Sequence, residues 1–98
     1  MDYINKVELQ GVIGEVTDTA PIIQFSLCTS HFYKGADSSL IETTWHLVKA
    51  DILNIKGVPE KGKFAHVIGR IKASKYCDLD GKEHYNFYIL ANKVMILD

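Results

Sequence analysis

The stretch 64–90 constrains the fold most, because it predicts one long β-hairpin. It consists of two strand-like runs on either side of the turn at residues 78–81, which reads Asp-Leu-Asp-Gly. In the first run, Val67, Ile71 and Ala73 alternate with polar residues, and successive side chains of a strand point to opposite faces. One face is therefore apolar or small, whereas the other is basic and ends in an aromatic ring. The basic face carries Arg70, Lys72, Ser74 and Tyr76.

The turn decides which residues of the two runs face each other. A three-residue loop with Gly81 in the left-handed conformation pairs Ala73 with Phe87, whereas a two-residue loop pairs Ala73 with Tyr88. Only the first brings the two apolar sets together, since a slip of one residue moves every side chain to the other face. We therefore expect Ala73 opposite Phe87, with Phe87 and Tyr85 in the core.

The rest of the chain predicts further strands. Apolar residues alternate with polar ones over 5–16, 22–30 and 40–50, residues 34–39 resemble a loop, and Asp51 is placed to cap one helical turn. Gly11 and Gly14 indicate bends or close approaches of the backbone. A single domain over residues 1–98 is expected. It is an all-β, five-stranded barrel of the oligonucleotide-binding type (OB fold), with a long hairpin of the last two strands and at most one short helix. A small sandwich is the competing architecture.

The composition limits the environment of the chain. The 98 residues are 47% hydrophobic, and no apolar run is long enough to cross a membrane. The N-terminus lacks the basic start and apolar centre of a signal peptide, and two separate cysteines, Cys28 and Cys77, fit a reducing compartment. We therefore expect a cytoplasmic protein. The net charge of −1 does not indicate a strongly basic protein, but residues 69–76 hold three cations and no acid.

Metal chemistry and catalysis are not expected from this sequence. The four histidines and two cysteines do not follow the spacing of a zinc site. The serines in the predicted strands have no evident base partner, as a nucleophile would require. The sequence therefore predicts neither a metal nor a cofactor, and a binding protein rather than an enzyme.

Several segments, taken in order, resemble the bacterial single-stranded DNA-binding proteins (SSB). They are residues 5–11, residues 25–30, Thr43-Thr44-Trp45-His46, Lys61-Gly62, and residues 67–76 followed by Asp78, Gly81 and Tyr85. The resemblance implies an OB fold, a homotetramer with a dimer as the fallback, and sequence-tolerant binding of single-stranded DNA in bacterial replication, recombination or repair, near the nucleoid. One aromatic position of the family falls at Asp51 and one basic position at Ser74. The family's acidic tail for recruiting repair proteins is not expected within this sequence, which ends at Asp98. Either such a tail has been removed, or the chain is a short form without partner recruitment.

The candidate interface combines aromatic rings with cations, because rings stack on bases while cations neutralise phosphates. The resemblance places stacking rings at Tyr33, Trp45 and Tyr76, and Tyr88 shares the basic face. Trp45 shares its strand face with Thr43 and Lys49, which favours an exposed ring over a core position. The alternatives are a plain surface tyrosine at Tyr33 and a core position for Phe32. The cations expected at phosphates are Lys34, Lys49, Arg70, Lys72 and Lys75.

Two rival functions remain. The first is a dimer of the primosomal replication protein N type, which shares the OB fold. The second is an OB domain that binds another protein, which the near-zero net charge supports. A basic surface around Lys72 and Tyr76 would favour nucleic acid, and an apolar or acidic one would favour a protein partner.

Overall fold

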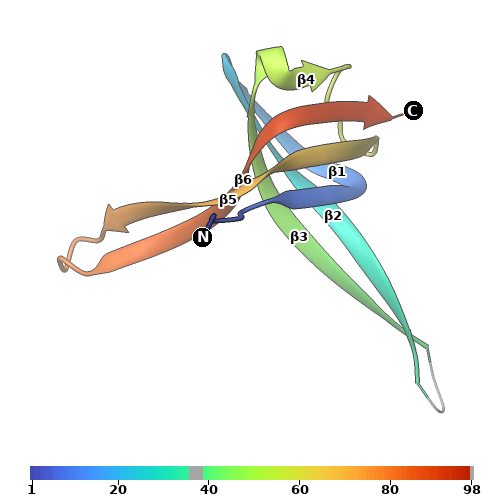
Figure 1. The fold of residues 1–98 in the computed structure, drawn as a ribbon, viewed down its shortest axis with the longest axis horizontal. Helices are drawn as coiled ribbons and strands as arrows, with labels where there is room; N and C mark the ends of the chain where they lie inside the picture. Colours follow the sequence, from blue (N-terminus) through green and yellow to red (C-terminus); the bar gives the residue numbers. More distant parts are fainter. Residues whose placement is uncertain (36–38, 98) are drawn as a thin grey trace.

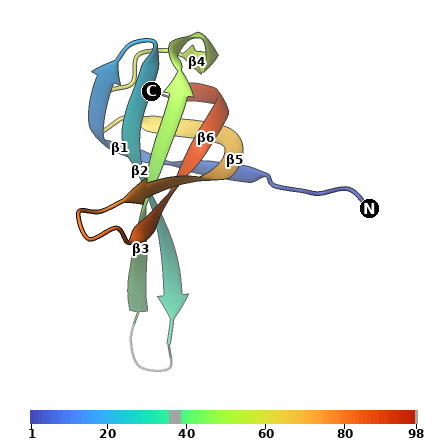
Figure 2. The same ribbon diagram turned by 90° about the vertical axis from the view of Figure 1, so that its left-hand side faces the viewer.

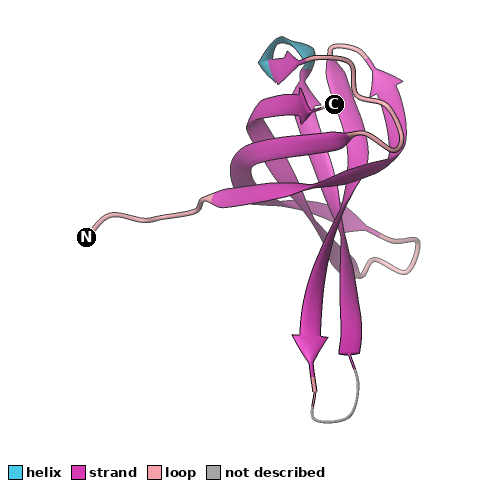
Figure 3. Ribbon diagram, turned by 90° about the vertical axis from the view of Figure 1, so that its right-hand side faces the viewer, coloured by secondary structure: helices cyan, strands magenta, loops and turns pink. Residues whose placement is uncertain are grey.

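The computed structural model describes residues 1–35 and 39–97 of the chain. Five long strands and one strand of two residues form a single sheet in this part of the chain. The strands are β1 (Val7–Thr19), β2 (Ile22–Lys34), β3 (Ser39–Asp51), β4 (Ile55–Lys56), β5 (Phe64–Cys77) and β6 (Glu83–Leu97). A 3-10 helix, η1 (Ile52–Asn54), lies between β3 and β4, as Figure 3 shows.

The strand order closes the sheet into a barrel. The long strands lie in the order β3-β2-β1-β5-β6, and β6 then pairs in parallel with β3, where Val48 is opposite Ile89. The neighbouring pairs β3–β2, β2–β1, β1–β5 and β5–β6 are antiparallel. This is the all-β, five-stranded OB barrel that the sequence predicts.

The alternating apolar residues fill the inside of the barrel. The largest fully buried side chains are Phe25, Ile13, Leu27, Val48, Val67 and Val94. Gly11 sits where β1 approaches β2 so closely that a Cβ atom would lie 1.9 Å from the carbonyl oxygen of Cys28. The close backbone approach predicted at Gly11 is therefore confirmed.

Two long hairpins project from the barrel in different directions (Figures 1 and 2). The β5–β6 arm is the hairpin predicted from the sequence. The β2–β3 arm is longer than predicted, because β2 continues beyond Ser30 to Lys34 and β3 begins at Ser39. The predicted loop at 34–39 therefore shrinks, and its residues 36–38 lie outside the described part of the chain. Phe32 is 71% exposed on this arm, so it is not a core residue.

The predicted register of the β5–β6 arm is confirmed. Ala73 pairs with Phe87, and the N–H of Asp78 donates to the carbonyl of Lys82 at 2.9 Å. Gly81 has a φ of +78°, the left-handed conformation that the three-residue loop requires.

The expected burial of the arm's apolar face is wrong. Phe87 is 67% exposed and Tyr85 is 56% exposed. The physical reason is that β6 leaves the barrel beyond its contact with β3 at Ile89, so the outer part of the arm, which carries Tyr85 and Phe87, projects away from the core. The prediction of which side chains share a face is correct, but the apolar face of the outer arm is exposed to solvent.

The short connection after β3 also agrees with the sequence. Asp51 caps η1, since its Oδ1 atom accepts a hydrogen bond from the N–H of Leu53 at 2.9 Å. Among the described residues, the structure contains no helix with the length and apolarity to cross a membrane.

Candidate nucleic-acid interface

Trp45 lies on the outer face of β3, opposite Cys28 of β2. Its side chain is 60% exposed, as the alternation of the strand predicts. The ring rests over Gly14 of β1, where a Cβ atom would come within 2.7 Å of the indole. The glycine therefore lets the indole lie against the barrel wall, which supports the ring while leaving much of it accessible to a ligand.

Lys49 connects this face of β3 to the β5–β6 arm. Its Nζ atom lies 4.4 Å from the centre of the Tyr88 ring, which is a cation–π contact. Lys49 also pairs with Leu90 in the parallel contact of β3 and β6. The outer face of the barrel and the base of the arm therefore form one surface with Trp45, Lys49 and Tyr88.

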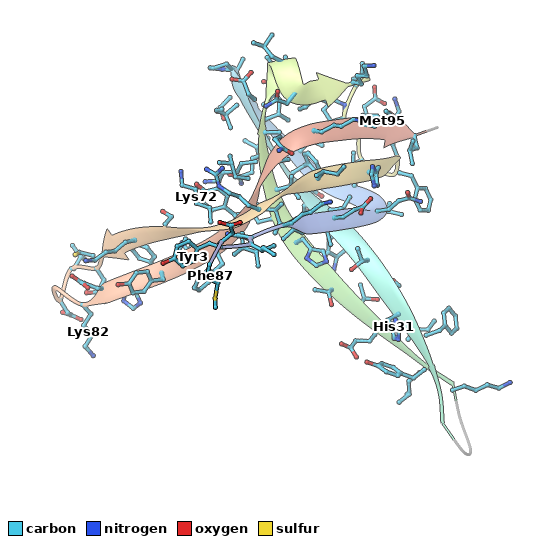
Figure 4. All side chains as sticks on the ribbon, in the orientation of Figure 1. Tyr3, His31, Lys72, Lys82, Phe87 and Met95 are labelled. Atoms are coloured by element: carbon cyan, nitrogen blue, oxygen red, sulfur yellow. The ribbon has the colours of Figure 1, made fainter. Side chains whose placement is uncertain are left out.

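The basic face of the arm continues this surface. Lys72 pairs with Tyr88, and Arg70 pairs with Leu90. Within residues 1–35 and 39–97, neither Arg70 nor Lys72 forms an ion pair. Lys72 and Phe87 point to opposite sides of the arm (Figure 4), so the cations are separated from the exposed apolar face. The surface around Lys72 is therefore basic and aromatic.

Tyr76 lies near the tip of the arm on the same face as Lys72. Its ring stacks on His84, with centroids 5.1 Å apart and 21° between the planes. The Nε2 atom of His84 lies 2.7 Å from the Asp78 carboxylate. This contact, followed by the N–H groups of Lys82 and Asp80, holds the pKa of Asp78 below its usual value. The turn thus orients a tyrosine ring that stays 47% exposed.

Lys75 stands apart from the other cations. It lies on the opposite face of the arm from Lys72 and Tyr76, because neighbouring residues of a strand alternate. Its Nζ atom is 2.8 Å from a carboxylate oxygen of Glu83. Its predicted phosphate contact is therefore not part of the surface that unites Trp45, Tyr88 and Lys72.

The two candidates of the β2–β3 arm lie on different faces. Tyr33 lies on the face opposite to Trp45, in edge-to-face contact with His31 at 4.9 Å between ring centres. Its hydroxyl is hydrogen-bonded to Glu42, which raises the pKa of Tyr33. Lys34 lies at the end of β2 on the face of Trp45. The structure therefore places Lys34, and not Tyr33, on the outer face. His31 lies on this arm, well away from Lys72 and Phe87 (Figure 4).

Phe32 is a residue of this outer face that the sequence reasoning missed. It pairs with Ile41, and both side chains are exposed on the side of Trp45. The register has no shift between this pair and the pair Cys28–Trp45, so the face is continuous. The signal was present in the sequence, because the alternation of β2 continues past Ser30 to Lys34.

The histidines and cysteines do not form a metal-binding cluster in the described part of the chain. His46, for example, is hydrogen-bonded through Nε2 to the Thr29 hydroxyl at 2.8 Å. The candidate site is therefore built from aromatic rings and cations.

Comparison with known proteins gives relatives of one kind, although no family model matches the chain. A single-stranded DNA-binding protein of Xanthomonas axonopodis pv. citri is 35% identical, over 96% of this chain and 58% of its own length. One of Xanthomonas campestris pv. campestris is 34% identical, over 96% of this chain and 60% of its own length. The chain therefore spans about three fifths of the length of these curated relatives.

Solved structures agree in fold. A Plasmodium falciparum SSB in complex with single-stranded DNA matches with a TM-score of 0.78 and 21% identity, over 100% of this chain and 98% of that chain. A small single-stranded DNA-binding protein from Streptomyces coelicolor matches with a TM-score of 0.65 and 21% identity, over 96% and 94% of the two chains. A deletion mutant of the single-stranded DNA-binding protein from Thermus aquaticus matches with a TM-score of 0.71 and 18% identity, over 97% of this chain and 51% of that chain.

Proposed function

The chain belongs to the family of single-stranded DNA-binding proteins, and from this premise we propose that it binds single-stranded DNA with little dependence on sequence. This proposal agrees with the expectation of a binding protein rather than an enzyme. The proposed context is the handling of single strands in replication, recombination or repair.

The observation that carries the proposal is the continuous outer surface of β3, β5 and β6. It presents the exposed rings of Trp45 and Tyr76 together with cations at Lys49, Arg70 and Lys72. A ring offers a stacking platform to any base, and a cation binds any phosphate, so this arrangement favours single strands without selecting a sequence. The paired strands at 70–76 and 84–90 carry no acidic residue on this face, which argues against the rival protein-binding module.

Titration with oligo(dT) tests the proposal directly. Trp45 is the only tryptophan of the chain, so the intrinsic fluorescence reports on this one ring. We expect quenching that saturates as the oligonucleotide is added. A protein-binding module of the same fold would show no quenching, and that result would overturn the proposal.

Lys72→Ala is expected to change the salt dependence of binding. Each phosphate contact that is lost removes about 0.7 from the slope of log affinity against log salt on a single strand. The measurement is an oligo(dT) titration at a series of salt concentrations. Lys56→Ala is the matched control, because Lys56 is an exposed lysine of β4, away from the outer surface of the arm. An unchanged slope for Lys72→Ala would remove Lys72 from the phosphate contacts.

We further propose that the protein assembles as a homotetramer, with a dimer as the alternative. The arm exposes a face with Ile71, Tyr85 and Phe87, and a contiguous apolar surface of this kind often marks an interface. We expect sedimentation at micromolar concentration to give the mass of four chains. A monomer under these conditions would contradict both forms of the proposal.

A further inference from the structure

A groove of about 450 Å³ extends the outer surface beyond Lys49. It lies where β3, β6 and β5 meet, and the N-terminal segment at Asn5 and Lys6 forms one side. Asp51, which lines it, follows Lys49 by two residues on the same face of β3, a spacing of about 7 Å. The same spacing places Asp51 about 20 Å along the strand from Trp45. The groove therefore lies within reach of a single strand that is stacked on Trp45.

Two hydrogen bonds between the Asn5 side chain and the backbone of Ile71 fix the N-terminal segment at one side of the groove. The side-chain amide of Asn5 donates to the carbonyl of Ile71 at 2.8 Å, and the N–H of Ile71 donates to Asn5 Oδ1 at 3.0 Å. Asn5 thereby binds the edge of β5 in the way that a paired strand would. The wall that carries Lys6 is fixed before any ligand arrives, which lowers the cost of binding.

The lining combines apolar side chains with polar and charged ones, and ligand sites use such polar groups to fix the orientation of a ring. Ile22 and Leu90 supply apolar side chains, while Arg70 and Lys6 supply donors. The volume lies within the range of ligand pockets, about 300 to 1,000 Å³, and is ample for one base. The groove therefore offers both a surface for the flat ring of a base and hydrogen-bonding groups for its edge.

Asp51 gives the groove an acceptor. Its Oδ1 atom accepts the hydrogen bond of Leu53, and no described residue donates to its second carboxylate oxygen. An ionised carboxylate can accept several hydrogen bonds and donates none. A ligand in the groove therefore meets the unpaired carboxylate oxygen of Asp51 and the donors of Arg70, beside the amide groups of Asn54 and Asn92.

We propose that this groove binds one unpaired base of the bound strand and favours a base that carries an exocyclic amino group. The inference rests on the proposed binding of single-stranded DNA, and it adds a base preference at this one site to a surface that otherwise has little dependence on sequence. Cytosine presents the N4 amino group to the carboxylate of Asp51, an established pairing in DNA recognition, and its N3 and O2 atoms accept from donors such as Arg70. Thymine has a carbonyl oxygen in place of the amino group, which the carboxylate repels.

The test compares oligo(dC) with oligo(dT) of equal length at one salt concentration, above neutral pH where cytosine is unprotonated. The readout is the ratio of the two dissociation constants, since stacking alone also gives pyrimidines different affinities. Asp51→Asn keeps an oxygen for the cap of η1 but replaces the free acceptor by an amide donor. We expect this change to shift the ratio against oligo(dC) by about tenfold.

Asp80→Asn is the matched control, because it removes the same charge from an exposed position of the hairpin turn. It is expected to alter both affinities together and to leave the ratio unchanged. An equal ratio in the unaltered protein and Asp51→Asn would overturn the base site while leaving the proposed function intact. Absence of binding to both oligonucleotides in the unaltered protein would overturn the proposed function itself.

A second measurement keeps the test independent of the folding of Asp51→Asn. In the unaltered protein, an oligonucleotide of 2-pyrimidinone, which lacks only the amino group of cytosine, should bind about tenfold more weakly than oligo(dC). Equal affinities for these two strands would show that the amino group is not recognised.

Discussion

Gly11→Ala is expected to lower the free energy of unfolding by about 3 kcal/mol, the upper part of the range for overpacking. The added Cβ atom would lie 1.9 Å from the Cys28 carbonyl oxygen, and backbone atoms of a paired strand cannot move aside as a flexible side chain can. A domain of this size has a total stability of about 5 to 15 kcal/mol. Thermal unfolding followed by circular dichroism should show a midpoint about 12 to 24 °C lower.

Gly81→Ala separates this steric effect from the ordinary cost of replacing glycine. A Cβ atom at Gly81 has no neighbour within 4 Å, but the φ of +78° costs an L-residue about 1 to 2 kcal/mol. Gly81→Ala should therefore be the milder variant. If Gly11→Ala lowers the free energy of unfolding no more than Gly81→Ala does, β1 and β2 separate easily at Gly11.

The register of the β5–β6 arm could be predicted because its determinants are local. The left-handed glycine at Gly81 fixes the loop, and the alternation of Ile71 and Ala73 with the cations fixes the faces. Both signals lie within one hairpin, so no knowledge of the rest of the fold was needed. The cap at Asp51 was predictable for the same reason.

The burial of the arm was not predictable in this way. Alternation indicates which side chains share a face, but it does not indicate whether another segment covers that face. Phe87 and Tyr85 alternate as core residues do, yet the arm carries them away from the barrel. The β2–β3 arm shows the same limit. Phe32 and Tyr33 lie on opposite faces of this arm, yet both side chains are exposed, so alternation did not indicate which face would be buried.

The sequence predicted the residues of the candidate site one by one, and the structure shows which of them share one surface. Trp45, Lys49, Lys72 and Tyr88 lie together because β3 pairs with β6 in parallel, a contact between strands far apart in the sequence. The groove beside Asp51 likewise depends on five separate segments of the chain. A local sequence pattern does not indicate which distant segments come together. The sequence therefore indicated Asp51 only as a helix cap and as the residue that replaces an aromatic ring of the family.

Trp45→Ala is expected to weaken oligo(dT) binding by about tenfold or more for each subunit engaged. Stacking of a base on an aromatic side chain contributes roughly 1 to 3 kcal/mol, and about 1.4 kcal/mol corresponds to one decade of affinity. The ring is 60% exposed on the barrel surface, so its removal should leave the fold intact. Because the variant has no tryptophan, binding is measured by the anisotropy of a labelled oligonucleotide.

Phe64→Ala is the matched control for Trp45→Ala, because Phe64 is an exposed aromatic residue at the start of β5, where β5 pairs with β1 and the end of β6. It should leave the affinity for oligo(dT) unchanged. The comparison with Lys72→Ala then separates stacking from charge, since loss of a ring lowers affinity at every salt concentration, whereas loss of a cation changes the salt slope. If Trp45→Ala binds normally while Lys72→Ala is weakened, the surface attracts phosphates but Trp45 is not a stacking platform. If both variants bind normally, DNA does not use this surface.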